Sequence, residues 1–293
     1  MARRWWAAAC ALLAIVALAC NGEVGGQSGG LGNPPPTSTT RTPGTPKPVA
    51  GMPSSMAAIG DSITAGYATC IAPSDCPRNS WSTGTGTLVD SHYKRILADN
   101  PAIKGHQRNY AVSGATAAGL ASQAEQAAAN HPAYLTIMIG ANDACRSTMT
   151  ATSTFATALG AALNAVKSRS PQTRILMVSI PDVYRVWEVG HTSRLARAVW
   201  SAAGICPQLL ANPTSTAAAD VTRRQAFRDQ VDAYDDQLER ACAGYGHLCR
   251  WDGGAVHRTS FGMGELSSLD FFHPNGAGQD EIARVTYPGS FTW

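Results

Sequence analysis

Ile59-Gly60-Asp61-Ser62-Ile63-Thr64-Ala65-Gly66-Tyr67 is the stretch that decides the fold of this 293-residue chain. It overlaps the short apolar run Met56–Ile59, which predicts a buried strand. A serine just past a strand end, where a helix can begin, is expected on the ligand-binding edge of a parallel α/β sheet. Gly-Asp-Ser is also a common turn signal. Its chemistry therefore depends on the residues that follow along the chain.

Further apolar runs alternate with longer segments of helical periodicity. The apolar runs are Asn109–Val112, Tyr134–Ile139, Ile175–Ile180 and His247–Trp251, and the helical segments are Leu88–Asp99, Ala117–Asn130, Phe155–Arg169 and Val221–Ala243. Such alternation predicts a parallel sheet with helices on both faces. We therefore expect an α/β fold of three layers, α/β/α, with a parallel, flavodoxin-like sheet of about five strands.

Polar residues follow each of the first four apolar runs. After Gly60-Asp61-Ser62 these are Ser113-Gly114-Ala115-Thr116, Gly140-Ala141-Asn142-Asp143 and Pro181-Asp182. The carboxyl ends of parallel strands meet at one edge of a sheet, so these residues are expected to gather there. The long segment from Pro181 to about Tyr245 is expected either to wall a groove above Ser62 or to pack as an extra helix.

The C-terminal part contributes Asp270-Phe271-Phe272-His273-Pro274-Asn275. His273 has a carboxylate three residues before it, and none of the other six histidines has a comparable setting. Asn275 is placed to cap a final helix through Glu281 to Val285, which would fix the backbone at His273. A fixed histidine suits a catalytic base, although a surface histidine in a capping loop would have the same sequence.

Composition limits the classes of function. Hydrophobic residues make up 44% of the chain and charged residues 15%, and the formal net charge is +3. With no Lys/Arg cluster, we expect no nucleic-acid partner. The sequence has no Cys-x-x-Cys pair, so no metal site is expected. Beyond the N-terminal segment the cysteines form an even set, which in an exported protein predicts three disulfides.

The N-terminal segment has the features of an export signal. Arg3-Arg4 precedes the apolar run from Ala7 to Ala19, which is short for a membrane span. Residues 1–20 are therefore a predicted signal peptide, and Cys20 is either the lipidated residue of a lipoprotein or is removed with the signal. Residues 21–53 are rich in Gly, Pro, Ser and Thr and predict a disordered linker before a domain at 54–293. The linker's formal G-x-S-x-G at Gly26–Gly30 lacks the strand and helix that this motif requires.

Four blocks in order make the chain resemble the SGNH hydrolases of the GDSL esterase/lipase group. They are Gly60-Asp61-Ser62, Gly114, Gly140-x-Asn142-Asp143 and Asp270-x-x-His273. The resemblance covers about Ser54 to the C-terminus, and the cysteine layout and export signal look most like secreted lipases and esterases of actinomycetes.

The resemblance implies a role for each residue. Ser62 would be the nucleophile, His273 its base and then the acid, and Asp270 the residue that orients the imidazole. The Ser62 N–H, the Gly114 N–H and the Asn142 amide would form the oxyanion hole, where one donor lowers the barrier by roughly 3–4 kcal/mol. Asp61 and Asp143 would support loop geometry.

The implied reaction is hydrolysis of a carboxylic ester through an acyl-serine, with no metal or cofactor. In some related enzymes a backbone carbonyl replaces the aspartate, so a dyad is the alternative to the triad. The substrate would be a small-molecule or lipid ester, and the protein a monomer, either secreted or tethered to the outer face of the membrane through Cys20. A carbohydrate O-acetyl esterase and a non-catalytic wall- or glycan-binding module are the alternative functions.

The spacing of the six remaining cysteines favours one disulfide pairing. Cys70–Cys76 and Cys242–Cys249 would each close a short loop, in which a partner is always near. Cys145–Cys206 would then tie the loop after Asn142 to the long segment that follows Pro181.

Overall fold

The computed structural model describes residues 46–293, which form one compact unit. The predicted signal peptide, the candidate lipidation residue Cys20 and most of the predicted linker lie outside these residues. The proposed domain start at residue 54 stays a prediction. Among the helices of residues 46–293, none is long and apolar enough to cross a membrane.

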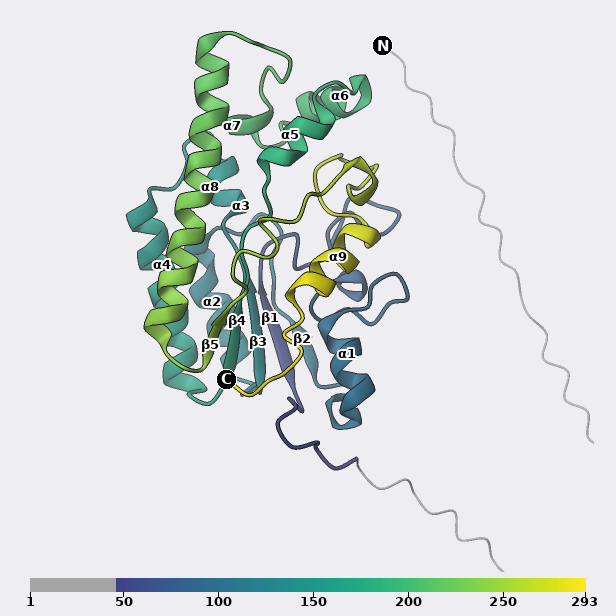
Figure 1. The fold of residues 1–293 in the computed structure, drawn as a ribbon, viewed down its shortest axis with the longest axis vertical. Helices are drawn as coiled ribbons and strands as arrows, with labels where there is room; N and C mark the ends of the chain where they lie inside the picture. Colours follow the sequence, from purple (N-terminus) through teal and green to yellow (C-terminus); the bar gives the residue numbers. More distant parts are fainter. Residues whose placement is uncertain (1–45) are drawn as a thin grey trace, which may run out of the picture. The chain divides into compact units, whose positions relative to one another are not determined.

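A parallel sheet in the order β2-β1-β3-β4-β5 forms the centre of the domain (Figure 1). Its strands are β1 (Met56–Gly60), β2 (Gln107–Asn109), β3 (Tyr134–Met138), β4 (Arg174–Met177) and β5 (Cys249–Trp251). This is the doubly wound order of flavodoxin-like folds, in which the chain reverses direction across the sheet beside its first strand. The predicted α/β/α architecture with about five parallel strands is confirmed.

Helices cover both faces of the sheet (Figure 1). One face carries α2 (Ala117–Ala128), α4 (Thr152–Arg169) and α8 (Ala218–Tyr245), and the other carries α1 (His92–Asp99) and α9 (Gly276–Thr286). Alternate strand residues point to opposite faces, so Ala57 and Ile59 join the apolar cluster under α2, α4 and α8, while Met56 joins the cluster under α1 and α9. Short 3₁₀ turns lie at Pro77–Asn79 (η1), Pro101–Ile103 (η2) and Met263–Glu265 (η3).

The long segment after β4 contains three short helices before α8. They are α5 (Tyr184–Gly190), α6 (Arg194–Ala203) and α7 (Pro207–Leu210). Together with α3 (Ala141–Cys145) they lie beyond the carboxyl ends of the strands, at the top of Figure 1. The segment therefore stands next to the edge at which the predicted site residues gather.

The second strand differs from its prediction. Apolar content favours Asn109–Val112, whereas β2 spans Gln107–Asn109. The ladder continues on one side, where the N–H groups of Tyr110 and Val112 donate to the carbonyls of Ala58 (2.8 Å) and Gly60 (3.2 Å). β2 is an edge strand that consists only of the polar residues Gln107, Arg108 and Asn109, so hydrophobicity is a poor guide to its bounds.

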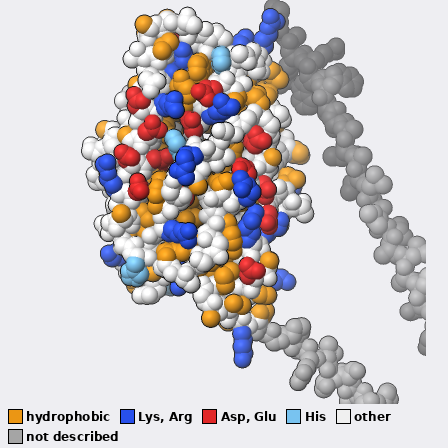
Figure 2. Space-filling view, viewed as in Figure 1, with side chains coloured by type: hydrophobic (Ala, Val, Ile, Leu, Met, Phe, Trp, Pro, Cys, Tyr) orange, Lys and Arg blue, Asp and Glu red, His pale blue; other side chains and the backbone are white. Residues whose placement is uncertain are grey.

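Charges of both signs are interspersed on the face seen in Figure 2. Lys and Arg side chains lie beside Asp and Glu side chains, with apolar side chains between them. No broad field of one sign covers this face to attract a strongly charged partner.

Candidate active site

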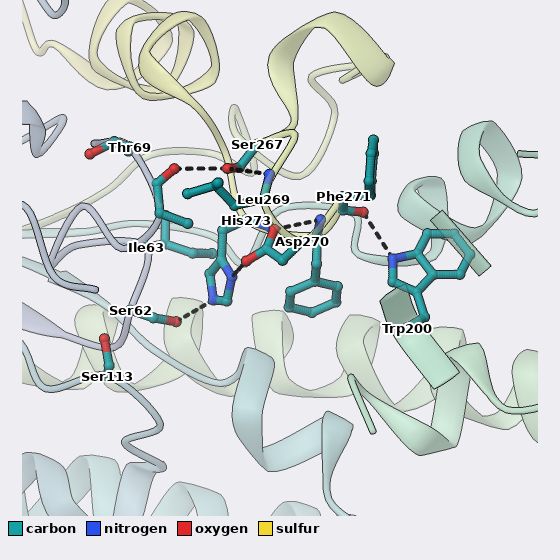
Figure 3. A network of polar contacts seen from close by, with 12 residues as sticks. Ser62, Ile63, Thr69, Ser113, Trp200, Ser267, Leu269, Asp270, Phe271 and His273 are labelled. Carbon is teal, nitrogen blue, oxygen red and sulfur yellow. Dashed lines mark hydrogen bonds and ion pairs between the residues drawn. The ribbon is translucent and has the colours of Figure 1, made fainter. Parts of the chain in front are cut away.

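Two segments far apart in the sequence, one with Ser62 and the other with Asp270 and His273, bring a hydroxyl, an imidazole and a carboxylate into one line (Figure 3). Ser62 Oγ lies 2.8 Å from Nε2 of His273, and Nδ1 of the same ring lies 2.7 Å from Oδ2 of Asp270. Ser62 and Asp270 are buried and His273 is half-buried. The ring of Tyr67 lies against the imidazole, with ring centroids 4.7 Å apart. This arrangement can pass a proton from the hydroxyl to the ring.

The turn before α9 holds the carboxylate and the imidazole together. Oδ1 of Asp270 accepts from the N–H groups of Phe272 (2.9 Å) and His273 (3.0 Å), so the carboxylate closes its own turn. Asn275 then caps α9, as predicted, by accepting from Ala277 N–H at 2.8 Å, a type of contact worth about 1 kcal/mol. Burial alone would raise the pKa of Asp270, but the hydrogen bond with His273 and the backbone N–H groups of the turn hold that pKa below its usual value.

Two buried glutamines hold the backbone on either side of Ser62. The side chain of Gln123 accepts from Gly60 N–H (2.8 Å) and donates to Gly60 O (3.0 Å), and Gln279 donates to Ile63 O at 2.7 Å. Gly60 has a φ of +149°, and a Cβ there would lie 2.1 Å from a carbonyl of β3. Only glycine fits this close approach, which places Ser62 at the sheet edge. Neither glutamine was predicted, because a glutamine inside a helix carries no local signal.

The three predicted oxyanion donors lie on neighbouring segments. Within residues 46–293, the N–H groups of Ser62 and Gly114 have no hydrogen-bond acceptor. Asn142 donates one of its two N–H groups to Ala115 O at 3.0 Å, and this bond ties it to the residue after Gly114. Gly114 has a φ of +78° and no protein atom within 4 Å of an added Cβ, so glycine is favoured there by backbone conformation.

Asp61 and Asp143 each accept a hydrogen bond from a backbone N–H group, as expected of residues that support loops. Oδ1 of Asp61 accepts from Ile63 N–H at 3.0 Å, and Oδ2 of Asp143 accepts from Ala117 N–H at 2.9 Å, at the first turn of α2. Oδ2 of Asp61 is buried and has no partner among the described residues. Burial raises the pKa of Asp61 to about 6, and the hydrogen bond from Ile63 N–H opposes that rise.

A hollow of about 190 Å³ lies over the serine. Its walls include Ser62, Asn142 and His273, whereas Gly114 is not among them. Cys145 and Cys206 also line it and are joined in a disulfide. The three disulfides in the structure, Cys70–Cys76, Cys145–Cys206 and Cys242–Cys249, have the pairing that the sequence predicted. Cys145–Cys206 therefore ties the segment after Asn142 to the start of α7.

A second histidine has carboxylate partners, contrary to the sequence analysis. His257 Nδ1 lies 3.0 Å from Oδ2 of Asp235, and its Nε2 lies 3.3 Å from Oδ1 of Asp232. The hydrogen bond with Asp235 raises the pKa of His257 to about 9. Both aspartates belong to α8, more than 20 positions before His257, so nothing local predicts the contact. Across residues 46–293, no group of three or more His, Cys, Asp or Glu side chains is arranged to hold a metal ion.

The model of the GDSL-like lipase/acylhydrolase family matches residues 58–281, well over half of the chain. The chain belongs to this family. The match includes Ser62, Asp270 and His273. As its name states, the GDSL-like family comprises lipases and acylhydrolases, so hydrolysis of esters is the general activity that membership indicates.

Solved structures from several bacteria resemble the domain. A lipase/acylhydrolase from Enterococcus faecalis is 16% identical, with 80% of this chain and 94% of that chain covered and a TM-score of 0.48. A variant of an acetyl-xylooligosaccharide esterase from Geobacillus Stearmophilus is 18% identical, with 82% and 94% covered and a TM-score of 0.49. An extracellular lipase from Streptomyces rimosus is 16% identical, with 79% and 97% covered and a TM-score of 0.43.

The sources of these structures are diverse, so a particular likeness to the actinomycete enzymes stays a prediction. No similar protein was found among the curated sequences.

Proposed function

We propose that this protein is a serine ester hydrolase that acts through an acyl-serine intermediate at Ser62. The observation that carries the proposal is the continuous line of hydrogen bonds from Ser62 through His273 to Asp270. A serine hydroxyl is a weak nucleophile until a base takes its proton, and here the base lies within hydrogen-bond distance. A non-catalytic glycan-binding module would not require these hydrogen bonds between a serine, a histidine and an aspartate.

In the proposed mechanism, Ser62 Oγ attacks the ester carbonyl while His273 Nε2 takes its proton. Asp270 holds the ring orientation and stabilises the imidazolium. The N–H groups of Ser62 and Gly114 and the amide of Asn142 stabilise the oxyanion. His273 then protonates the leaving alcohol, and water releases the acid by the same steps in reverse.

An active-site phosphonate tests this mechanism. We expect a fluorophosphonate to add one adduct to the protein, located at Ser62 by peptide mass spectrometry, and Ser62→Ala to remove both labelling and turnover of p-nitrophenyl esters. Labelling of another residue, or turnover retained by Ser62→Ala, would contradict the mechanism. Deacetylation of sugars with no turnover of p-nitrophenyl esters would instead favour the carbohydrate O-acetyl esterase.

The shape of the site supports a short apolar acyl group. A second cavity, of about 40 Å³, adjoins the hollow over Ser62 and shares Ile63, Ala141, Phe272 and His273 with it. Apolar side chains dominate its lining, among them Val183, Val186, Phe261 and Leu266. One water-sized group needs about 10–15 Å³ by this measure, so the cavity has room for about three such groups. We propose that it takes the acyl chain and that the wider hollow takes the alcohol.

A series of p-nitrophenyl esters from acetate to laurate tests the acyl site. We expect kcat/KM to be highest near butyrate and to fall for longer chains. Val186→Ala, which enlarges the apolar cavity, should move the optimum to longer chains. Val199→Ala, on α6 and outside both cavities, is the matched control and should leave the optimum unchanged. A preference for laurate in the wild type would contradict the assignment.

We further propose that the protein acts outside the cytoplasm, because three disulfides suit an oxidising compartment. Lipidation of Cys20 stays a proposal that rests on sequence. It predicts that the protein incorporates a labelled fatty acid and sediments with membranes, and that Cys20→Ser loses both properties. A mature N-terminus located downstream of Cys20 would contradict it.

A further inference from the structure

Trp200 makes the one hydrogen bond that joins the α5–α7 segment to the turn carrying Asp270 and His273, among the hydrogen bonds of residues 46–293 (Figure 3). Its indole Nε1–H donates to Phe271 O at 3.1 Å. The side chain is 1% exposed, and a Cβ on Gly190 would lie 2.4 Å from its ring. Gly190 belongs to α5, and its lack of a side chain makes room for this indole.

The bond reaches the turn at its most strained residue. Phe271 has a φ of +53°, in the left-handed region that a phenylalanine rarely adopts. Its N–H donates to Ser267 O at 2.7 Å, so Trp200 and Ser267 hold the two ends of the same residue. The left-handed conformation turns the chain between Asp270 and His273, which allows the carboxylate to face the imidazole at 2.7 Å.

We propose that Trp200 is a positioning residue for catalysis: its indole N–H holds Phe271 in the left-handed conformation that directs Asp270 onto His273. This inference rests on the proposed function, because it assigns Asp270 and His273 their roles in catalysis. Trp200 lines neither the hollow over Ser62 nor the apolar cavity beside it, so it acts on the base through the turn and not on the substrate.

Trp200→Phe removes the donor and retains most of the ring. We expect kcat to fall about tenfold with KM little changed, because small displacements of catalytic groups reduce the rate strongly. The acid limb of the pH–rate profile should also move to lower pH, because a displaced carboxylate stabilises the protonated base less. A purely structural role would lower the melting temperature and leave that limb in place.

Trp187→Phe is the matched control. Its indole also donates to a backbone carbonyl, Pro213 O just after α7, at 2.7 Å, and among the hydrogen bonds of residues 46–293 it makes none to the turn. It should lose a comparable amount of thermal stability and keep the wild-type pH profile. Equal effects of the two variants on kcat and on pH dependence would overturn the proposal and show that Trp200 only packs.

A second variant keeps the test decisive if Trp200→Phe is poorly folded. Glycine adopts a φ of +53° without strain, so Phe271→Gly removes the need for the indole. In that background, Trp200→Phe should lower kcat far less than it does in the wild type, and an undiminished loss would overturn the proposal. Ser62→Ala, measured in parallel, separates this outcome from failure of the proposed function, because turnover retained by that variant contradicts the function itself.

Discussion

Two histidines of this protein are paired with aspartates, and only one pair is placed for catalysis. His273 contacts Asp270 at 2.7 Å and His257 contacts Asp235 at 3.0 Å, in both cases through Nδ1. The difference lies at Nε2, which faces the Ser62 hydroxyl in His273 and a second carboxylate, Asp232, in His257. A carboxylate beside a histidine is therefore no sign of catalysis until the partner of the other nitrogen is known.

The surroundings give the two rings different chemistry. The hydrogen bond with Asp235 outweighs burial and raises the pKa of His257 to about 9, so this ring is positively charged at neutral pH and cannot accept a proton. It ties α8 to the chain after β4, since its Nδ1 also lies 3.1 Å from Ile180 O and Asp235 accepts from Ile180 N–H. The His257 pair thus holds the scaffold in place, whereas the His273 pair adjoins the hollow.

The largest expected contrast is between the two histidines themselves. His273→Ala should lower kcat by a factor on the order of 10⁴ or more, as should Ser62→Ala, because members of such a unit fail together. His257→Ala should retain most of the activity and lose thermal stability. Steady-state kinetics on p-nitrophenyl butyrate at one pH measures the contrast, and comparable losses in the two variants would remove the distinction between the pairs.

The two aspartates sharpen the comparison. Asp270→Asn should lower kcat by about 10²–10⁴, less than Ser62→Ala does, because the nucleophile, the base and the oxyanion donors stay in place. Asp235→Asn should have no comparable effect. An unchanged kcat in Asp270→Asn would support a dyad in which a backbone carbonyl orients His273, and the Ser62/Asp270 double variant checks that the losses do not add.

Two disulfides offer the same contrast between site and scaffold. Replacing the cysteines of Cys145–Cys206 or of Cys242–Cys249 by serine should cost about 2–5 kcal/mol of unfolding free energy in each case. Only the first pair lines the hollow over Ser62, so only its loss should also raise KM. Chemical denaturation and steady-state kinetics on both variants test this. An equal rise in KM in the two variants would count against the idea that Cys145–Cys206 shapes the hollow over Ser62.

The smallest expected effect is a pH dependence of stability from the scaffold pair. The pKa of His257 is raised in the folded state, so its contribution is fully present below about 6.5, the value of a free histidine, and is lost as the pH rises to about 9. Asp235, Asp232 and Asp182 are the charged groups that favour its protonated form. Melting temperatures of the wild type should fall over this range, and His257→Gln should flatten the fall. Parallel curves for the two proteins would show that another group is responsible.

Local sequence signals were enough for much of the fold and for the members of the candidate site. Apolar runs located four of the five strands closely, and β2 was shifted because its residues, Gln107-Arg108-Asn109, are all polar. Asn275 and the spacing from Asp270 to His273 are signals within a few residues. They correctly indicated a helix cap and a carboxylate that reaches the imidazole.

What the sequence determined by itself is the order of the elements and the residue types that chemistry requires at their ends. Only the tertiary structure decided that Trp200 reaches Phe271, that Gln123 and Gln279 hold the backbone beside Ser62, and that His257 is an ion-pair partner and not a base. The reason is physical. Turns, caps and strand periodicity depend on neighbours along the chain, whereas a hydrogen bond between residues far apart in sequence exists only after the packed sheet and helices bring its two ends together.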